Sequence, residues 1–123
     1  MPSVLVVDNN EDSRRFIKFY LEICGCEVIE ADSGEMATRL AQELRPQLIL
    51  MDLMMPHLDG FDTTRQIRKL EGMSEVPIIV LSSYVYDVEI KQRAMKEGAT
   101  DCLVKPNDIG RLKSIVKQYL SAA

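Results

Sequence analysis

Four short runs of hydrophobic residues recur along the chain, and each ends at a polar residue. The runs and the polar residues that follow them are Val4–Val7 with Asp8, Leu48–Met51 with Asp52, Ile78–Leu81 with Ser82, and Leu103–Val104 with Lys105. Short apolar runs rich in β-branched residues, bounded by turn residues and separated by helical patterns, predict strands of a parallel sheet. Because open α/β sheets bind ligands at the carboxyl ends of their strands, we expect these polar residues to converge.

Amphipathic patterns between the runs predict helices. Asn10 is the expected N-cap of a helix that ends at Gly25 and carries an apolar stripe of Phe16, Ile17, Tyr20, Leu21 and Cys24. Ser33 is the expected N-cap of a second helix that stops before Pro46 and carries Met36, Ala37, Leu40, Ala41 and Leu44. A third helix is expected to start near Asp59–Gly60 and to end by Gly72, and its inward-facing residues would be Phe61, Thr64, Ile67 and Leu70.

Two further helices are expected in the second half of the chain. The segment 86–97 has only a thin apolar stripe of Ile90, Ala94 and Met95, so it is expected to be the least firmly docked helix. The last helix is expected to begin near Asn107–Asp108 and to carry Ile109, Leu112, Ile115, Val116, Tyr119 and Leu120.

The strand order follows from which strands resemble edge strands. Residues 26–31 mix apolar and acidic side chains, and the run 102–104 is very short, whereas the other three runs are continuously apolar. Placing these two segments at the edges predicts the order 2-1-3-4-5 in a doubly wound α/β sheet with helices on both faces. No linker or repeat interrupts residues 1–123, so one domain is expected.

Composition excludes several classes of function. A chain of 123 residues with 46% hydrophobic and 28% charged residues is ordinary for one globular domain. Its net charge of −4, without a basic stripe, gives no reason to expect nucleic acid or an anionic membrane as partner. No apolar stretch has the length of a membrane span and no signal peptide is apparent, so a cytoplasmic location is expected. Cys24, Cys26 and Cys102 lack metal-site spacing and are expected to be reduced packing residues.

The residues at the strand ends suggest phosphoryl chemistry. Asp8 and Asp52, on neighbouring strands, would form an oxygen-rich pocket of the kind that Mg²⁺ prefers. One of these carboxylates can instead act as a nucleophile and take a phosphoryl group. Ser82 supplies a hydroxyl donor and Lys105 a cation, which match the needs of a transferred phosphoryl group.

The chain resembles the response-regulator receiver domain of two-component signalling, a family that includes single-domain chemotaxis regulators. The matching motifs are Val6-Val7-Asp8-Asn9, Met51-Asp52-Leu53-Met54-Met55-Pro56 with Asp59-Gly60, Leu81-Ser82-Ser83, Gly98-Ala99 and Val104-Lys105-Pro106. They span essentially the whole chain, and the resemblance implies a flavodoxin-like fold.

The resemblance also implies a role for each site residue. Asp52 would be the phospho-acceptor, and Ser82 and Lys105 would contact the phosphoryl group. Asp8, Asp52 and the backbone carbonyl of Met54 would hold Mg²⁺. The Lys105–Pro106 peptide would be cis.

Two positions depart from the family pattern. Asn9 stands where a second acid usually ligates the metal; its amide oxygen can still bind Mg²⁺, but the lost charge predicts an affinity about tenfold lower. Glu11 is a candidate for a compensating carboxylate, although the simpler interpretation is favourable charge in the first helical turn. Cys102 replaces an aromatic residue that commonly takes part in switching, a role for which Tyr84 and Tyr86 are the alternative candidates.

Other polar residues near the site have simpler interpretations. Asp59 before Gly60 is expected to form an N-cap or an Asx turn, and His57 is expected to be a solvated loop residue.

The leading hypothesis is a stand-alone receiver that is not a classical enzyme. It would take a phosphoryl group on Asp52 from a sensor histidine kinase or a phosphotransfer protein. It would then either relay this group or signal to a downstream protein through residues 86–97 and the last strand and helix. The alternative is a pseudo-receiver that binds partners without phosphorylation. A haloacid-dehalogenase-type phosphatase would require an acid at Met54, and a flavodoxin-like FMN carrier a phosphate loop where Asp8 and Asn9 stand, so both are disfavoured.

Overall fold

A five-stranded parallel sheet forms the centre of the protein in a computed structural model that describes residues 1–53, 55, 59–82, 88–104 and 109–120. The strands are β1 (Ser3–Val7), β2 (Glu27–Ala31), β3 (Leu48–Asp52), β4 (Ile78–Ser82) and β5 (Asp101–Val104). Their order is β2-β1-β3-β4-β5, which confirms the predicted order and the two edge strands.

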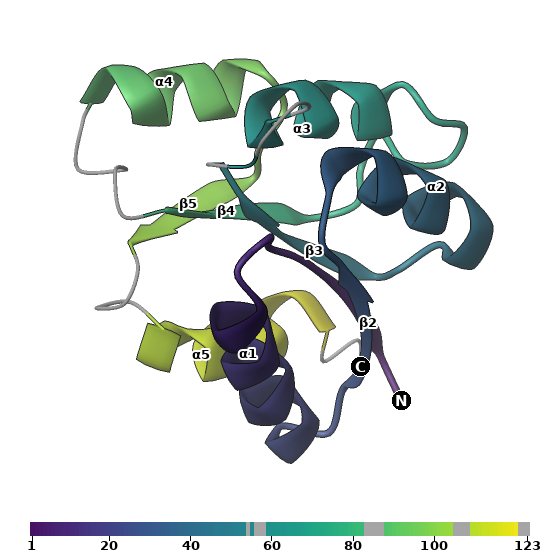
Figure 1. Cartoon of the computed structure of the whole chain (residues 1–123), viewed down its shortest axis with the longest axis vertical. Coiled ribbons are helices and arrows are strands. Elements are labelled where there is room, and N and C mark those ends of the chain that lie inside the picture. The colour runs from purple at the N-terminus through teal and green to yellow at the C-terminus, as the bar shows by residue number, and fades with distance from the viewer. Residues whose placement is uncertain (54, 56–58, 83–87, 105–108, 121–123) are drawn as a thin grey trace.

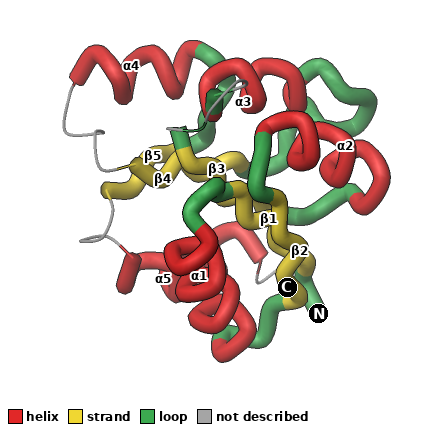
Figure 2. The backbone as a smooth tube through the Cα atoms, in the orientation of Figure 1, coloured by secondary structure: helices red, strands yellow, loops and turns green. Residues whose placement is uncertain are grey.

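The helices cover both faces of this sheet. On one face lie α1 (Glu11–Ile23) and α5 (Leu112–Leu120), which follows a 3₁₀ turn at Ile109–Arg111 (Figure 1). On the other face lie α2 (Gly34–Leu44), α3 (Gly60–Arg68) and α4 (Val88–Lys96) (Figure 2). This is the predicted doubly wound, flavodoxin-like arrangement. None of the helices in the described residues is long and apolar enough to cross a membrane.

The continuous apolar runs of the central strands arise because both faces of the sheet are buried. In β1, Val4 and Val6 pack toward α1 and α5, whereas Leu5 and Val7 pack toward α2, α3 and α4. The strand β3 alternates in the same way, and all five of its residues are buried. A strand between two helical layers needs no polar face, so its sequence shows no alternation of polar and apolar residues.

The three predicted N-caps are confirmed. The side chain of Asn10 accepts a hydrogen bond from the Ser13 N–H at 2.9 Å. The Ser33 hydroxyl accepts from the Met36 N–H at 3.2 Å, and the Asp59 carboxylate from the Asp62 N–H at 2.9 Å. Each cap satisfies a backbone donor that has no partner within its helix, and thereby determines where the helix begins.

Several details of the predicted helices are wrong. Phe16 and Leu44, which the pattern assigned to apolar stripes, are 59% and 52% exposed, and Met95 is 42% exposed. By contrast, α3 ends at Arg68, which agrees with the prediction that this helix ends by Gly72. Apolar residues occupy more of each helix surface than the sheet can cover, so the helical period alone does not identify the buried ones. The expected start of the last helix at Asn107–Asp108 lies outside the described residues.

Gly60 begins α3 against the backbone of β3. A Cβ atom added at Gly60 would lie 2.3 Å from the carbonyl oxygen of Asp52 and 2.7 Å from the Cα of Leu53. The Gly60 N–H donates to the Leu53 carbonyl at 3.1 Å, so the two segments cannot separate without losing this hydrogen bond. The first turn of α3 thus holds the end of β3 in place.

Gly60→Ala is therefore expected to lower the free energy of unfolding by about 2 kcal/mol, because backbone must move to admit the methyl group. Chemical denaturation measures this loss. Gly110→Ala is the control, since a Cβ there meets nothing within 4 Å, and its effect should stay within about 0.5 kcal/mol. Equal effects of the two substitutions would contradict the close approach at Gly60.

Candidate functional site

The buried carboxylates Asp8 and Asp52 lie side by side at the carboxyl edge of the sheet. Val7 pairs with Met51 in the parallel register of β1 and β3, so the next residues, Asp8 and Asp52, are neighbours. Both continue the side-chain alternation toward the face covered by α1 and α5. Asp8 is 1% exposed and Asp52 is 9% exposed. The fold thus brings two acidic groups to one buried edge.

Ser82 ends the next strand. Asp52 pairs with Leu81 in the register of β3 and β4, so Ser82 lies one residue beyond the level of Asp52, and it is 1% exposed. Ser82 in turn pairs with Val104 of β5, the residue that precedes Lys105. The predicted roles of Lys105, of the Met54 carbonyl and of the Lys105–Pro106 peptide lie outside the described residues, as do His57, Tyr84 and Tyr86.

Local hydrogen bonds orient the carboxylate of Asp8. The Asn10 N–H donates to Oδ1 of Asp8 at 2.9 Å, and the Asp8 N–H donates to the Ala31 carbonyl at 3.0 Å. The chain therefore turns sharply after β1 and enters α1 with Asp8 held at the sheet edge. Asn9, within this turn, is exposed.

A charged cluster supports the same turn, and the sequence pattern did not reveal it. The Arg14 guanidinium donates to the Asp8 carbonyl at 2.8 Å and to the carboxylate of Glu30 at 3.0 Å. Lys18 also reaches Glu30, at 3.3 Å. Arg14, Glu30, Asp32 and Met36 line a small open pocket of about 110 Å³ beside this cluster. Arg14 thus ties the end of β1 to the end of β2.

The charge of Glu30 depends on these two cations. Desolvation raises the pKa of Glu30, but hydrogen bonds and charge from Arg14 and Lys18 outweigh desolvation and hold this pKa below its usual range. One signal in the sequence could have identified the Arg14–Glu30 pair. Arg14 precedes the buried Ile17 by one helical turn, so it lies near the core-facing side of its helix, where a cation requires an acidic partner.

The donor atoms fit a hard divalent cation. Asp8 and Asp52 offer carboxylate oxygens, the ligands that Mg²⁺ prefers, and both are buried at one edge. Among the described residues no group of three or more histidine, cysteine, aspartate or glutamate side chains forms a closed metal site. A site with two carboxylates leaves coordination positions for water and a phosphoryl oxygen, as Mg²⁺ sites usually do.

Two other residues noted in the sequence have structural roles away from the two carboxylates. Glu11, the candidate for a compensating carboxylate, pairs with Arg15 at 2.8 Å on the exposed side of α1. Cys102 is a free, buried thiol in the core beneath α4, and burial, with a smaller effect of Asp101, raises its pKa. Cys102 is therefore a packing residue of β5 in this structure.

Comparison with known proteins identifies a family and several similar structures. The family described as the response regulator receiver domain matches residues 4–117. The chemotaxis protein CheY4 of Vibrio cholerae superposes with a TM-score of 0.91 at 32% identity, over 98% of this chain and 99% of CheY4. The receiver domain of the sensor histidine kinase PA1611 from Pseudomonas aeruginosa PAO1, with magnesium coordinated in its active-site cleft, superposes with a TM-score of 0.89 at 30% identity, covering 98% of both chains.

The curated relatives differ in length. The DNA-binding dual master transcriptional regulator RpaA of Synechocystis is 31% identical over 98% of this chain, which spans 49% of RpaA. An uncharacterized 14.6 kDa protein of Leptolyngbya boryana is 35% identical over 97% of this chain, which spans 90% of that protein. The chain thus spans about half of the first relative and most of the second.

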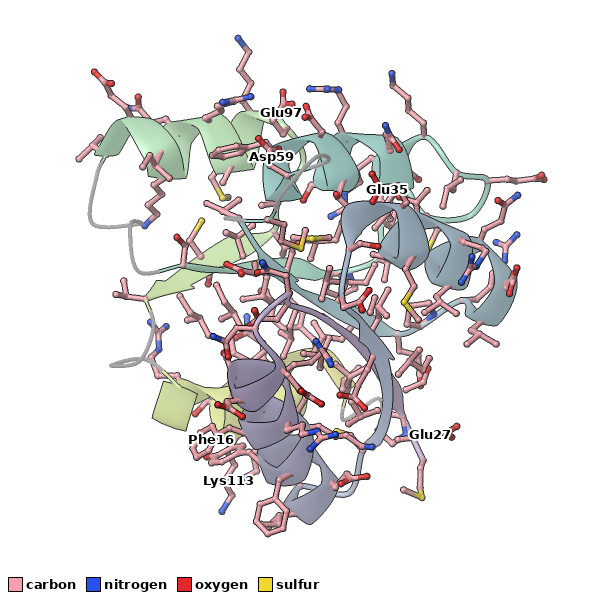
Figure 3. All side chains as sticks on the ribbon, in the orientation of Figure 1. Phe16, Glu27, Glu35, Asp59, Glu97 and Lys113 are labelled. Carbon is pink, nitrogen blue, oxygen red and sulfur yellow. The ribbon has the colours of Figure 1, made fainter. Side chains whose placement is uncertain are left out.

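Glu30→Gln is expected to make stability less dependent on pH in the acid range. Because the pKa of Glu30 is lowered on folding, its ionised form stabilises the protein fully above the unfolded-chain pKa of about 4.3, by about 1 kcal/mol. This contribution is lost as pH falls through the lower pKa of the folded protein. Urea denaturation from pH 7 to pH 3 should therefore show Glu30→Gln less stable than wild type at neutral pH and equally stable in acid. The control is Glu27→Gln, an exposed position on the same strand (Figure 3); a similar pH dependence in both variants would contradict this assignment.

Proposed function

The chain belongs to the response regulator receiver domain family of two-component signalling, a family of signalling modules and not of classical enzymes, and on this premise we propose that Asp52 accepts a phosphoryl group. The donor is a phosphohistidine of a sensor histidine kinase or of a phosphotransfer protein. A receiver domain implies a cognate histidine kinase as partner.

The observation that carries this proposal is the pair of buried carboxylates. Asp8 and Asp52 are adjacent in register, and a buried hydroxyl, that of Ser82, ends the neighbouring strand. Two carboxylates at one buried edge, next to a hydroxyl, supply the oxygen ligands and the donor that a cation and a phosphoryl group require. Such an arrangement favours a role in which a cation and a phosphoryl group are bound.

Asp52, Ser82 and Lys105 each have a different role in the phosphoryl transfer. A carboxylate oxygen of Asp52 forms a bond to phosphorus while the bond between phosphorus and the donor nitrogen breaks. The electron pair of the broken bond stays on that nitrogen. The hydroxyl of Ser82 donates a hydrogen bond to a phosphoryl oxygen. The ammonium of Lys105 stabilises the negative charge on another phosphoryl oxygen. The product is an acyl phosphate on Asp52.

The proposed metal ligands are Asp8, Asp52, the amide oxygen of Asn9 and the backbone carbonyl of Met54. When bound there, Mg²⁺ neutralises charge on the phosphoryl oxygens. The magnesium in the receiver domain of PA1611 supports this choice of metal. Because the second position carries an amide and no formal charge, the metal site is expected to be weaker than one with two adjacent acids.

We propose that residues 1–123 form one receiver domain that signals through protein contacts, with α4, β5 and α5 as the surface that responds to phosphorylation. The near-complete coverage of the protein from Leptolyngbya boryana supports a receiver that acts without an output domain. The amide at Asn9, in place of a second acid, favours one alternative function. In this alternative the chain is a pseudo-receiver that binds its partner without phosphorylation.

Incubation with acetyl phosphate and Mg²⁺ is expected to add one phosphoryl group to the wild-type protein, as read by intact mass. Asp52→Asn should abolish the adduct, since an amide is not a nucleophile of this kind. Asp59→Asn is the matched control, because asparagine caps a helix as well as aspartate does and phosphorylation should persist. No adduct on wild type, or an adduct that survives Asp52→Asn, would contradict the proposal and favour the pseudo-receiver.

Asn9→Asp is expected to tighten Mg²⁺ binding about tenfold, because it adds a carboxylate next to Asp8. Isothermal titration with MgCl₂ measures the dissociation constant. The matched control is Asn10→Asp, which adds the same charge one residue further along but keeps the side chain in its N-cap hydrogen bond to Ser13. Equal effects of the two substitutions would show that general charge, and not a ligand at position 9, determines the affinity.

A further inference from the structure

Arg14 contacts the turn after β1 on both sides of Asn9. Its guanidinium donates to the Asp8 carbonyl at 2.8 Å, and its backbone N–H donates to the Asn10 carbonyl at 3.0 Å. Asn9 is exposed, and its position depends on the residues on either side of it. Arg14 therefore holds the residue before Asn9 with its side chain and the residue after Asn9 with its backbone.

Further hydrogen bonds fix the two neighbours of Asn9. The Asp8 N–H donates to the Ala31 carbonyl at 3.0 Å, and Oδ1 of Asp8 accepts from the Asn10 N–H at 2.9 Å. A substitution at position 14 leaves the groups that make these bonds in place and removes the side-chain contact to the Asp8 carbonyl. The role of this one contact can therefore be tested by itself.

Glu30 holds the Arg14 side chain in position for this contact. Glu30 lies in β2, opposite Val6 of β1 in the parallel register, and accepts from Nε of Arg14 at 3.0 Å. The side chains of Arg14 and Glu30 are 14% and 31% exposed, so this pair is more shielded than an ordinary surface ion pair. A guanidinium can bond a carboxylate through Nε and a carbonyl through Nη1 at once, because its donors form a rigid planar fork.

The charge of Arg14 does not explain its place beside a metal site. A cation bound to the carbonyl of Asp8 would by charge alone weaken the binding of Mg²⁺, because like charges repel. Glu30 offsets one positive charge, but it is shared between Arg14 and Lys18, so the cluster has more positive than negative charge. A favourable effect of Arg14 on metal binding can therefore come only from geometry.

We propose that Arg14 is a positioning residue of the metal site. It fixes the peptide that joins Asp8 to Asn9, so that both side chains are presented together to Mg²⁺. This inference rests on the proposed function, because it takes Asp8 and Asn9 as metal ligands. A fixed turn matters more here than in a site with two adjacent acids, since the amide of Asn9 lacks the charge that attracts a carboxylate to a cation. Residues that orient metal ligands commonly change affinity about tenfold or more.

Titration with MgCl₂ at constant ionic strength, followed by amide NMR shifts, separates geometry from charge. Arg14→Gln is expected to raise the Mg²⁺ dissociation constant about fivefold or more, although loss of a cation would by itself lower this constant. Arg14→Lys keeps the charge but cannot bond the Asp8 carbonyl and Glu30 together, so it is also expected to raise the constant. Urea denaturation verifies that each variant is folded.

Lys18→Gln is the matched control, because it removes the same charge from the same cluster. Within the described part of the chain, Lys18 donates to Glu30 at 3.3 Å and makes no hydrogen bond to the turn. The Mg²⁺ dissociation constant of Lys18→Gln should therefore equal that of wild type or be slightly lower.

Hydrogen exchange of the backbone amides in the metal-free protein tests the turn without Mg²⁺. The Asn10 N–H, which donates to Oδ1 of Asp8, should exchange about fivefold faster or more in Arg14→Gln, because the turn opens more often. The Glu27 N–H, which donates to the Pro2 carbonyl at the other end of β2, should exchange as in wild type. Lys18→Gln should leave both exchange rates unchanged.

Three results would overturn this inference alone. They are Mg²⁺ binding by Arg14→Gln that is as tight as in wild type or tighter, an equal loss of affinity in Lys18→Gln, and unchanged exchange of the Asn10 N–H in Arg14→Gln. Wild-type protein that binds no Mg²⁺ would instead overturn the metal site of the proposed function together with this inference. Faster exchange in Arg14→Gln would then show a purely structural role for Arg14.

Discussion

The parallel register between β1 and β3 determines where the two buried carboxylates lie. With Val7 opposite Met51, Asp8 and Asp52 emerge together at the carboxyl edge, on the same side of the sheet. A shift of one residue between these strands would move one of the acids to the other face. The register is in turn held by burial on both faces, since Val4, Val6, Leu48 and Leu50 pack in one core while Leu5, Val7, Ile49 and Met51 pack in the other.

Two loops depend on that register. After β1, the chain turns through Asn9 with Asp8 bound to the Asn10 N–H, and Arg14 returns from α1 to bind the Asp8 carbonyl. After β3, Gly60 approaches so closely that no side chain fits against the Asp52 carbonyl. The site therefore combines an edge held by two cores with turns held by hydrogen bonds. In the proposed role, these two acids would hold a cation at the edge.

Much of this arrangement could be predicted from the sequence because its signals are local. Apolar runs identify strands, a polar residue before a helical pattern identifies Asn10, Ser33 and Asp59 as caps, and the composition of the edge strands identifies the order. The exposure of Phe16 and Leu44 could not be predicted, since it depends on how much of each helix the sheet covers. The Arg14–Glu30 pair joins residues sixteen positions apart, on elements whose packing the pattern does not describe. The roles of Asp52, Ser82 and Lys105 remain predictions that geometry supports for the first two.

Reduction of the phosphorylated protein with borohydride tests whether Asp52 is the phospho-acceptor. After phosphorylation by acetyl phosphate with Mg²⁺, borohydride converts an aspartyl phosphate to homoserine, and tandem mass spectrometry of the peptides locates it. Homoserine is expected at position 52, with unchanged aspartate at position 8. Homoserine at position 8 or at any other aspartate, with position 52 unchanged, would contradict it.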